Sequence, residues 1–171
     1  MGIRAKLFAA FFAIACFGSI PLRAENPVKE KQDRFSLAVE CIKRFEGWHS
    51  SWHYPYVGWG HCLQPGEKYS AHTMTRQQAD ELLRKDLRRF CAMFRQFGKD
   101  SLLLATLAYN VGPYRLLGNK KIPKSTLVRK LEAGDRNIYK EYISFRCYKG
   151  KVVPSIERRR KVEFELLYIC L

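Results

Sequence analysis

The segment that most constrains the fold is Leu102 to Val111, which is apolar on nearly every side of the helix that it predicts. Asp100 is a candidate N-cap before this helix, and Gly112-Pro113 ends it. A helix without a polar face has to be buried among other elements. The chain is therefore predicted to fold around a buried central helix.

The N-terminal half combines one helix with one hairpin. A helix is expected over residues 35–45, where apolar residues recur at helical spacing between Asp33, a candidate N-cap, and Gly47, a natural stop. Residues 48–65 are aromatic and glycine-rich and have no helical stripe. Two short strands joined by a tight turn are expected there, around Tyr54 to Val57 and Trp59 to Leu63.

The second half is predicted to be helical throughout. Thr75 and Gln78 match a capping box at the start of a long helix that runs to about Phe97. Further helices are expected at residues 125–133, 136–145 and 156–169, the last capped by Ser155. The expected fold class is α+β, predominantly helical, with a small N-terminal β-hairpin. It would form one domain over residues 35–171, preceded by a polar arm at residues 25–34.

Residues 1–24 have the pattern of a secretory signal peptide. Arg4 and Lys6 give a positive start, Leu7 to Ile20 is apolar, and Leu22-Arg23-Ala24 offers a cleavage site. The apolar run is too short and too poorly flanked for a typical membrane span, although a short membrane anchor is the alternative. After cleavage near Ala24, the protein is expected in the periplasm or outside the cell.

The charge of the chain favours an anionic partner. The formal net charge is +15, and removal of Arg4, Lys6 and Arg23 with the signal peptide would leave +12. Such a charge suits nucleic acid, anionic lipid or a cell-wall polymer. Because export would take the chain away from cytosolic nucleic acid, a cell-wall polymer is the favoured partner. Any membrane contact is expected to be peripheral. The protein is expected to be a monomer.

Five cysteines would remain after cleavage, an odd number whose spacings match no disulfide framework. One or two disulfides and one free buried thiol are expected, with the pairs unassigned. The cysteines are Cys41, Cys62, Cys91, Cys147 and Cys170.

Glu46 is the candidate catalytic residue. It stands where the first predicted helix meets the hairpin. A carboxyl group held against aromatic surface is desolvated, which favours its protonated form, and a glycosidase needs such an acid for its leaving group. Taken alone, the Phe45-Glu46-Gly47 tripeptide would favour a solvated glutamate at a helix end. The aromatic side chains nearby either stack on sugar rings or pack in the core: Phe45, Trp48, Trp52, Tyr56 and Trp59.

Three segments resemble the phage-type lysozymes. Ile42-Lys43-Arg44-Phe45-Glu46-Gly47, followed by Gly58-Trp59-Gly60-His61, is similar to the family's opening segment and hairpin. Leu107-Ala108-Tyr109-Asn110-Val111-Gly112 resembles its central helix, and Arg159-Arg160-Lys161-Val162-Glu163 its closing helix. The resemblance implies a lysozyme-like fold and a muramidase without cofactor. Such an enzyme cleaves the β-1,4 bond between N-acetylmuramic acid and N-acetylglucosamine in bacterial peptidoglycan, with Glu46 as general acid.

The chain departs from that family after the glutamate. The family places an Asp and then a Thr around a catalytic water, but no Asp or Glu occurs here between Glu46 and Glu67, and Tyr56 stands where the Thr is expected. His53 is the nearest candidate for the missing Asp, with His49 behind it. Either His53 or Tyr56 orients a water for hydrolysis, or Glu46 works alone with the substrate's N-acetyl group, as in a lytic transglycosylase.

Other polar residues near these motifs have two interpretations each. The resemblance assigns Trp59, His61 and Asn110 to substrate binding. The structural alternative for His61 is a hydrogen bond within the fold. The structural alternative for Asn110 is a cap at the helix end. Arg159 and Arg160 have the pattern of charges on a solvated face. The resemblance instead implies that one of them braces Glu46 by an ion pair.

Three rival functions follow from the same sequence. His49, His53, His61 and Cys62 could hold zinc in a wall endopeptidase, but no His-Glu-x-x-His spacing supports a metal site, and none is expected. The missing Asp also fits an inactive peptidoglycan-binding module of an envelope machine. A cationic membrane-active protein acting through its basic closing helix is the third rival.

Overall fold

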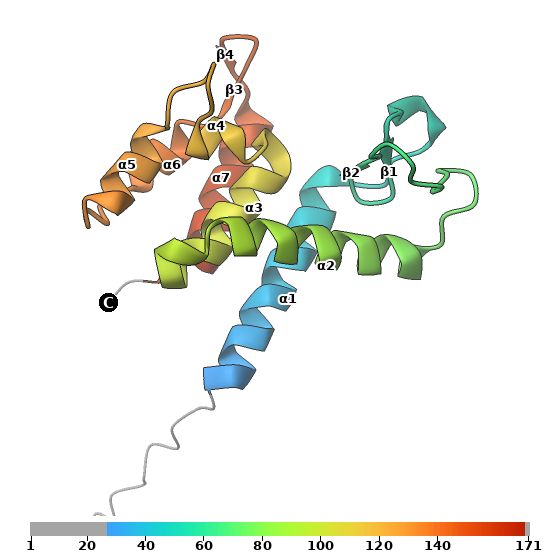
Figure 1. Cartoon of the computed structure of the whole chain (residues 1–171), viewed down its shortest axis with the longest axis horizontal. Helices are drawn as coiled ribbons and strands as arrows, with labels where there is room; N and C mark the ends of the chain where they lie inside the picture. Colours follow the sequence, from blue (N-terminus) through green and yellow to red (C-terminus); the bar gives the residue numbers. More distant parts are fainter. Residues whose placement is uncertain (1–26, 170–171) are drawn as a thin grey trace, which may run out of the picture.

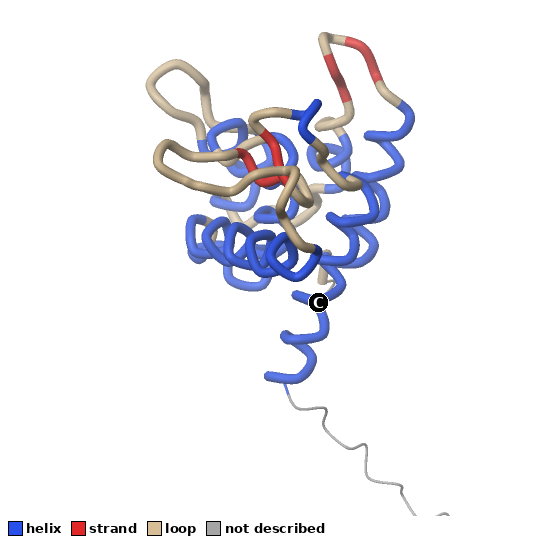
Figure 2. The backbone as a smooth tube through the Cα atoms, turned by 90° about the vertical axis from the view of Figure 1, so that its right-hand side faces the viewer, coloured by secondary structure: helices blue, strands red, loops and turns tan. Residues whose placement is uncertain are grey.

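The computed structural model describes residues 27–169, which are mostly helical (Figure 1). Two antiparallel hairpins accompany the helices, β1 (Tyr56–Val57) with β2 (His61–Cys62) and β3 (Cys147–Tyr148) with β4 (Lys151–Val152). Both hairpins lie at the end of the molecule away from the start of α1 (Figures 1 and 2). The predicted α+β class with dominant helix is confirmed. The α-helices are α1 (Pro27–Glu46), α2 (Arg76–Met93), α3 (Ser101–Val111), α4 (Tyr114–Leu117), α5 (Thr126–Glu132), α6 (Tyr139–Ile143) and α7 (Pro154–Leu167).

Helix α3 is the buried centre that its composition predicts. Its apolar residues from Leu103 to Ala108 are fully buried, and α1, α2, α4 and α7 pack against it. Fully burying one leucine side chain contributes about 1.5–3 kcal/mol, so this helix is a main source of stability. Asp100 occupies the N-cap position, as predicted, but its side chain makes no cap hydrogen bond and instead pairs with Arg136 at 2.7 Å.

Helix α2 begins as predicted and ends earlier. Thr75 Oγ1 accepts a hydrogen bond from the Gln78 backbone N–H at 3.1 Å, and Gln78 Oε1 accepts one from the Thr75 N–H at 2.9 Å. The α-helix stops at Met93, and a 3-10 segment, η2 (Arg95–Asp100), then carries the chain around to α3. The apolar stripe continues into this segment, which is why the sequence predicted one longer helix.

Helix α1 begins at Pro27, well before the expected start at residue 35. Residues 28–34 are largely Lys, Glu, Gln and Arg, which favour a helix without forming an apolar stripe, and proline is well suited to the first helical position. Asp33 is therefore inside the helix and is not its cap, and the polar arm is helical from residue 27. The predicted signal peptide, residues 1–24, lies outside the described residues.

The C-terminal third contains elements that the sequence did not predict. They are the one-turn helix α4 and the β3–β4 hairpin, whose four strand residues are all exposed and so lack the alternation that marks a strand. Helix α7 begins at Pro154 with Val153 as its N-cap, so the prediction that Ser155 caps it is wrong.

Two further expectations concern membranes and cysteines. Among the helices within residues 27–169, none is long and apolar enough to cross a membrane.

Cys41 is the buried free thiol, and burial raises its pKa to about 11. Neither Cys62 nor Cys147 forms a disulfide, contrary to the expectation for an exported chain, and Cys170 lies outside the described residues.

Candidate active site

Glu46 is the last residue of α1, and the chain turns away directly after it. Gly47 has a φ of +68°, a left-handed conformation that glycine adopts without strain, and its N–H donates to the Lys43 carbonyl at 3.1 Å. The Glu46 side chain is 16% exposed. The end of α1 therefore holds a carboxyl group that is mostly buried but still partly accessible to solvent.

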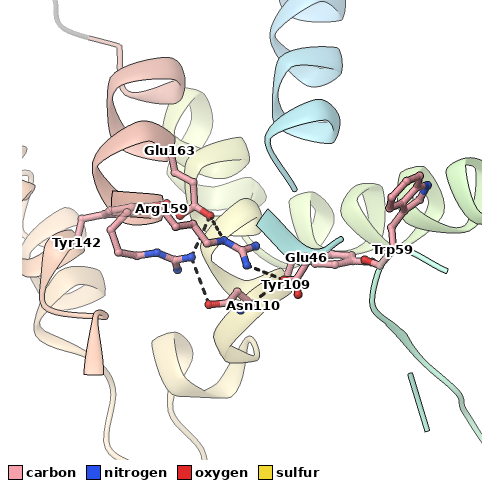
Figure 3. A network of polar contacts seen from close by, with 8 residues as sticks. Glu46, Trp59, Tyr109, Asn110, Tyr142, Arg159 and Glu163 are labelled. Carbon is pink, nitrogen blue, oxygen red and sulfur yellow. Dashed lines mark hydrogen bonds and ion pairs between the residues drawn. The ribbon is translucent and has the colours of Figure 1, made fainter. Parts of the chain in front are cut away.

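The nearest partner of Glu46 is a cation. Arg159 Nη1 donates to Glu46 Oε1 at 2.7 Å, and Asn110 Nδ2 lies 3.4 Å from the same oxygen (Figure 3). Within the described part of the chain, the other oxygen, Oε2, has no hydrogen-bond partner, and it is not enclosed. The expectation of a carboxyl group held mainly against aromatic surface is thus replaced by one oxygen fixed by α7 and α3 and a second oxygen left open.

Behind Glu46, the closing helix carries a buried network of charges. Glu163 accepts hydrogen bonds from Arg159 Nε at 2.8 Å and from Arg160 Nη2 at 3.0 Å. Tyr142 donates its hydroxyl proton to the other Glu163 oxygen at 2.9 Å. Two guanidinium groups and two carboxylates balance one another, as buried charges require.

This network fixes the orientation of Arg159. Burial lowers the pKa of its guanidinium, but the nearby carboxylates of Glu163 and Glu46 outweigh burial and raise it. For Arg160, which is fully buried, burial dominates and the pKa is lowered. The interpretation of both arginines as a solvated charge run is wrong. The implication of the resemblance, that one of them pairs with Glu46, is confirmed for Arg159.

Asn110 and its neighbour Tyr109 connect α3 to both sides of the site. Asn110 is exposed, and its Oδ1 accepts a hydrogen bond from Arg160 Nη2 at 3.3 Å while its Nδ2 faces Glu46. Tyr109 is largely buried and donates its hydroxyl proton to the Trp59 carbonyl at 3.0 Å. Consecutive residues at the end of the central helix therefore hold the candidate acid and the hairpin. Asn110 is exposed beside Glu46, and its role toward a substrate stays a prediction.

The Trp59 side chain is occupied by packing between the hairpin, α1 and α2. Its Nε1–H donates to Asp80 at 2.6 Å, and its ring meets Trp48 edge-to-face with centroids 5.2 Å apart. Arg76 lies over both rings, at 4.0 Å from the Trp48 centroid and 4.8 Å from that of Trp59. This arrangement favours a structural role for Trp59. Trp52, in contrast, is almost fully exposed.

His61 is buried with both ring nitrogens engaged. Nδ1 lies 2.5 Å from Asp86 Oδ2, and Nε2 lies 2.7 Å from Glu67 Oε2. The geometry favours the structural alternative for His61, because no nitrogen is left for a substrate. Asp86 was missed as its partner, although it falls on the apolar stripe of α2 between Leu83 and Leu87, where an acid must be buried and paired.

His53 ends a short 3-10 segment, η1 (Ser51–His53), Tyr56 begins β1, and both residues are exposed. His53 Nδ1 accepts a hydrogen bond from the Ser50 backbone N–H at 3.0 Å. Among the described contacts, none joins Glu46 to either residue; both rings instead pack around His49, with centroids 4.9 Å (His53) and 6.0 Å (Tyr56) from it. Their predicted role at the catalytic water stays a prediction.

The zinc alternative gains no support from the fold. Across residues 27–169, no group of three or more His, Cys, Asp and Glu side chains is placed to hold a metal ion.

Comparison of the sequence with known families gives a match. The sequence model described as Phage lysozyme matches residues 43–163, which include Glu46, Asn110 and Arg159. The chain belongs to the phage lysozyme family. A search of curated proteins gave no match.

Solved structures support the fold assignment. The endolysin from Escherichia coli O157:H7 phage FAHEc1 is similar over 77% of this chain and 90% of its own, with 21% sequence identity and a TM-score of 0.59. The muramidase domain of SpmX from Asticaccaulis excentricus is similar over 78% of this chain and 96% of its own, with 23% identity and a TM-score of 0.61. The fold of this phage lysozyme family member is therefore lysozyme-like, as its motifs implied.

Proposed function

We propose that this protein is a muramidase that hydrolyses the β-1,4 bond between N-acetylmuramic acid and N-acetylglucosamine in peptidoglycan, with Glu46 as the general acid. Membership of the phage lysozyme family supports lysozyme-type activity on peptidoglycan. The observation that carries the finer proposal is the asymmetry of the Glu46 carboxyl group. One oxygen is held by Arg159, and the other is open.

That asymmetry gives the acid a defined direction. Arginine only donates hydrogen bonds, so Oε1 acts as the acceptor when it faces Arg159. In the neutral carboxyl group, the proton therefore lies on Oε2, the oxygen without a partner. A glycosidic oxygen placed against Oε2 would receive this proton as its bond to the anomeric carbon breaks.

A lytic transglycosylase is the second candidate function. It is favoured by the lack of any acidic residue between Glu46 and Glu67, where the family has an Asp. In that reaction Glu46 would act as acid and then as base, the substrate's N-acetyl group would assist, and an anhydro-sugar end would remain.

The charge of the chain suits the proposed substrate. Peptidoglycan carries peptide carboxylates, and a chain with a net charge of +15, or +12 without residues 1–24, is attracted to it. We also propose, from the signal-like pattern of residues 1–24, that the protein acts in the periplasm or outside the cell.

Digestion of purified peptidoglycan tests the proposal. Wild type, Glu46→Gln and Glu40→Gln would be compared, because Glu40 lies on the same helix, is exposed and, among the described side chains, pairs with Lys43. Mass spectrometry of the new glycan ends is expected to show reducing ends from wild type and Glu40→Gln and almost none from Glu46→Gln. Anhydro ends would establish the transglycosylase instead, and no release from wild type would favour the binding module.

A further inference from the structure

Gly60 lies beside both the Glu46 carboxyl group and the His49 imidazole. A side chain at Gly60 would begin 3.6 Å from Glu46 Cδ and 3.5 Å from His49 Cε1. Glu46 Cδ and His49 Cε1 are therefore at most about 7 Å apart, and both border the same glycine. Gly60 has a φ of +93°, so the sequence keeps a residue without a side chain at this point.

The hairpin holds the His49 ring in place. The His49 backbone N–H donates to the Gly58 carbonyl at 2.8 Å, in an isolated bridge next to the β1–β2 pair. His53 packs edge-on against the ring, and Tyr56 lies on it at a tilt. His53 and Tyr56, which the sequence offered as helpers of Glu46, thus pack against a third residue, His49, whose ring borders Gly60 as Glu46 does.

One nitrogen of His49 is enclosed and the other is open. Nδ1 is buried and has no hydrogen-bond partner within the described residues, whereas Nε2 is not enclosed. His53 differs, because its Nδ1 already accepts a hydrogen bond from the Ser50 N–H and lies 3.2 Å from the Ser50 hydroxyl. Of these two imidazoles, His49 is the one shown to border Gly60 together with Glu46, and its Nε2 is open and unpaired within the described residues.

We propose that His49 is the general base of the hydrolysis, taking the place of the carboxylate that the chain lacks. Inverting glycosidases keep about 6.5–9.5 Å between acid and base to leave room for a water, and the upper limit of about 7 Å for Glu46 and His49 reaches the lower part of that range. The inference rests on the proposed function, because it assigns a second residue to the same reaction.

The proton and electron balance of the step is simple. Nε2 takes a proton from the water as its oxygen forms a bond to the anomeric carbon. The bond from that carbon to the glycosidic oxygen breaks, its electron pair stays on the leaving oxygen, and this oxygen takes the proton from Glu46 Oε2. Solvent then removes the proton from His49 and returns one to Glu46.

The test compares His49→Ala, His53→Gln and His72→Gln. His72 is an exposed loop histidine, far along the chain from the hairpin, and serves as the matched control. Release of reducing ends from peptidoglycan would be measured between about pH 4 and pH 9, with and without added imidazole. Thermal unfolding of each variant would check that it is folded.

The expected result is a loss of about 100-fold or more for His49→Ala, partial recovery with imidazole, and a larger share of anhydro ends as water attack fails. The fall in rate on the acid side of the wild-type profile should flatten in this variant. His53→Gln should lose less activity, and His72→Gln should behave as wild type.

Two results would overturn the inference while leaving the proposed function intact. One is a folded His49→Ala variant that keeps a rate within about threefold of wild type, since a base contributes far more. The other is an equal loss at every pH without recovery by imidazole, which would show that His49 only supports the hairpin. If wild type itself releases no ends, the proposed function fails, and the inference fails with it.

Discussion

Replacing Asp86 by Asn should loosen the hairpin from α2 by an amount that depends on pH. The His61 and Asp86 side chains are 5% and 8% exposed, and their closest atoms are 2.5 Å apart. Glu67 engages the second His61 nitrogen, and Arg89 lies 3.6 Å from the second Asp86 oxygen. Burial lowers the pKa of His61, but the hydrogen bonds to Asp86 and Glu67 outweigh burial, and the pKa is raised.

The sign of the effect follows from these shifts. Because the folded-state pKa of His61 is raised, its contribution to stability is fully present below the unfolded value of about 6.5 and is lost as pH rises through the folded value. The pKa of Glu67 is lowered by its hydrogen bond to His61, so its contribution is lost as the solution becomes strongly acidic. The network is therefore strongest between about pH 5 and pH 6.5.

The magnitude is set by burial. Removing one partner of a buried ion pair costs about 3–5 kcal/mol, and because His61 can release its proton in the variant, we expect the lower end, about 3 kcal/mol, near pH 5.5. Near pH 9 the wild-type histidine is less protonated, and the loss should approach that of an ordinary hydrogen bond, about 1 kcal/mol.

Urea unfolding at both pH values measures this difference. Glu81→Gln is the control, since it removes the same charge from an exposed position on the same helix. It should change the free energy of unfolding by less than about 0.5 kcal/mol. A loss for Asp86→Asn that is equal at the two pH values, or below about 1 kcal/mol near pH 5.5, would refute the reasoning.

Three further outcomes are expected. Glu163→Gln should lower the free energy of unfolding by about 3–5 kcal/mol in urea, because Arg159 and Arg160 lose their shared buried carboxylate; a loss under about 1 kcal/mol would contradict this. Tyr109→Phe should cost about 1–2 kcal/mol in the same assay, because the Trp59 carbonyl loses its donor, and an unchanged midpoint would count against that bond. Sedimentation with insoluble peptidoglycan should show weaker binding as the salt concentration rises from about 0.05 M to about 0.5 M. Binding that does not depend on salt would show that the net positive charge does not attract the protein to peptidoglycan.

Elements with a local sequence signal were predictable. The central helix was evident because no side of it is polar, and the start of α2 because Thr75 and Gln78 are three residues apart. Helix α1 was predicted too short because its N-terminal residues favour a helix through propensity, without the apolar periodicity that was used to find it. The β3–β4 hairpin has no alternating pattern in the sequence, because its strands are exposed and bury neither face.

The site was harder to predict because its contacts join distant parts of the chain. Arg159 and Arg160 form a run of like charges in the sequence, and only the packing of α7 against α1 and α3 turns them into the buried partners of Glu46 and Asn110. The position of Glu46 could be predicted from the family resemblance. The approach of His49 to Gly60 depends on the course of the hairpin, which no spacing in the sequence determines.

The most direct test of the proposed chemistry is the rate at which reducing N-acetylmuramic acid ends appear when soluble glycan chains are treated with wild type and with Glu46→Gln. If Glu46 is the general acid, the substitution should lower this rate by at least about 100-fold while the protein stays folded. A Glu46→Gln variant that forms reducing ends at the wild-type rate would contradict the assignment of Glu46 as the catalytic acid.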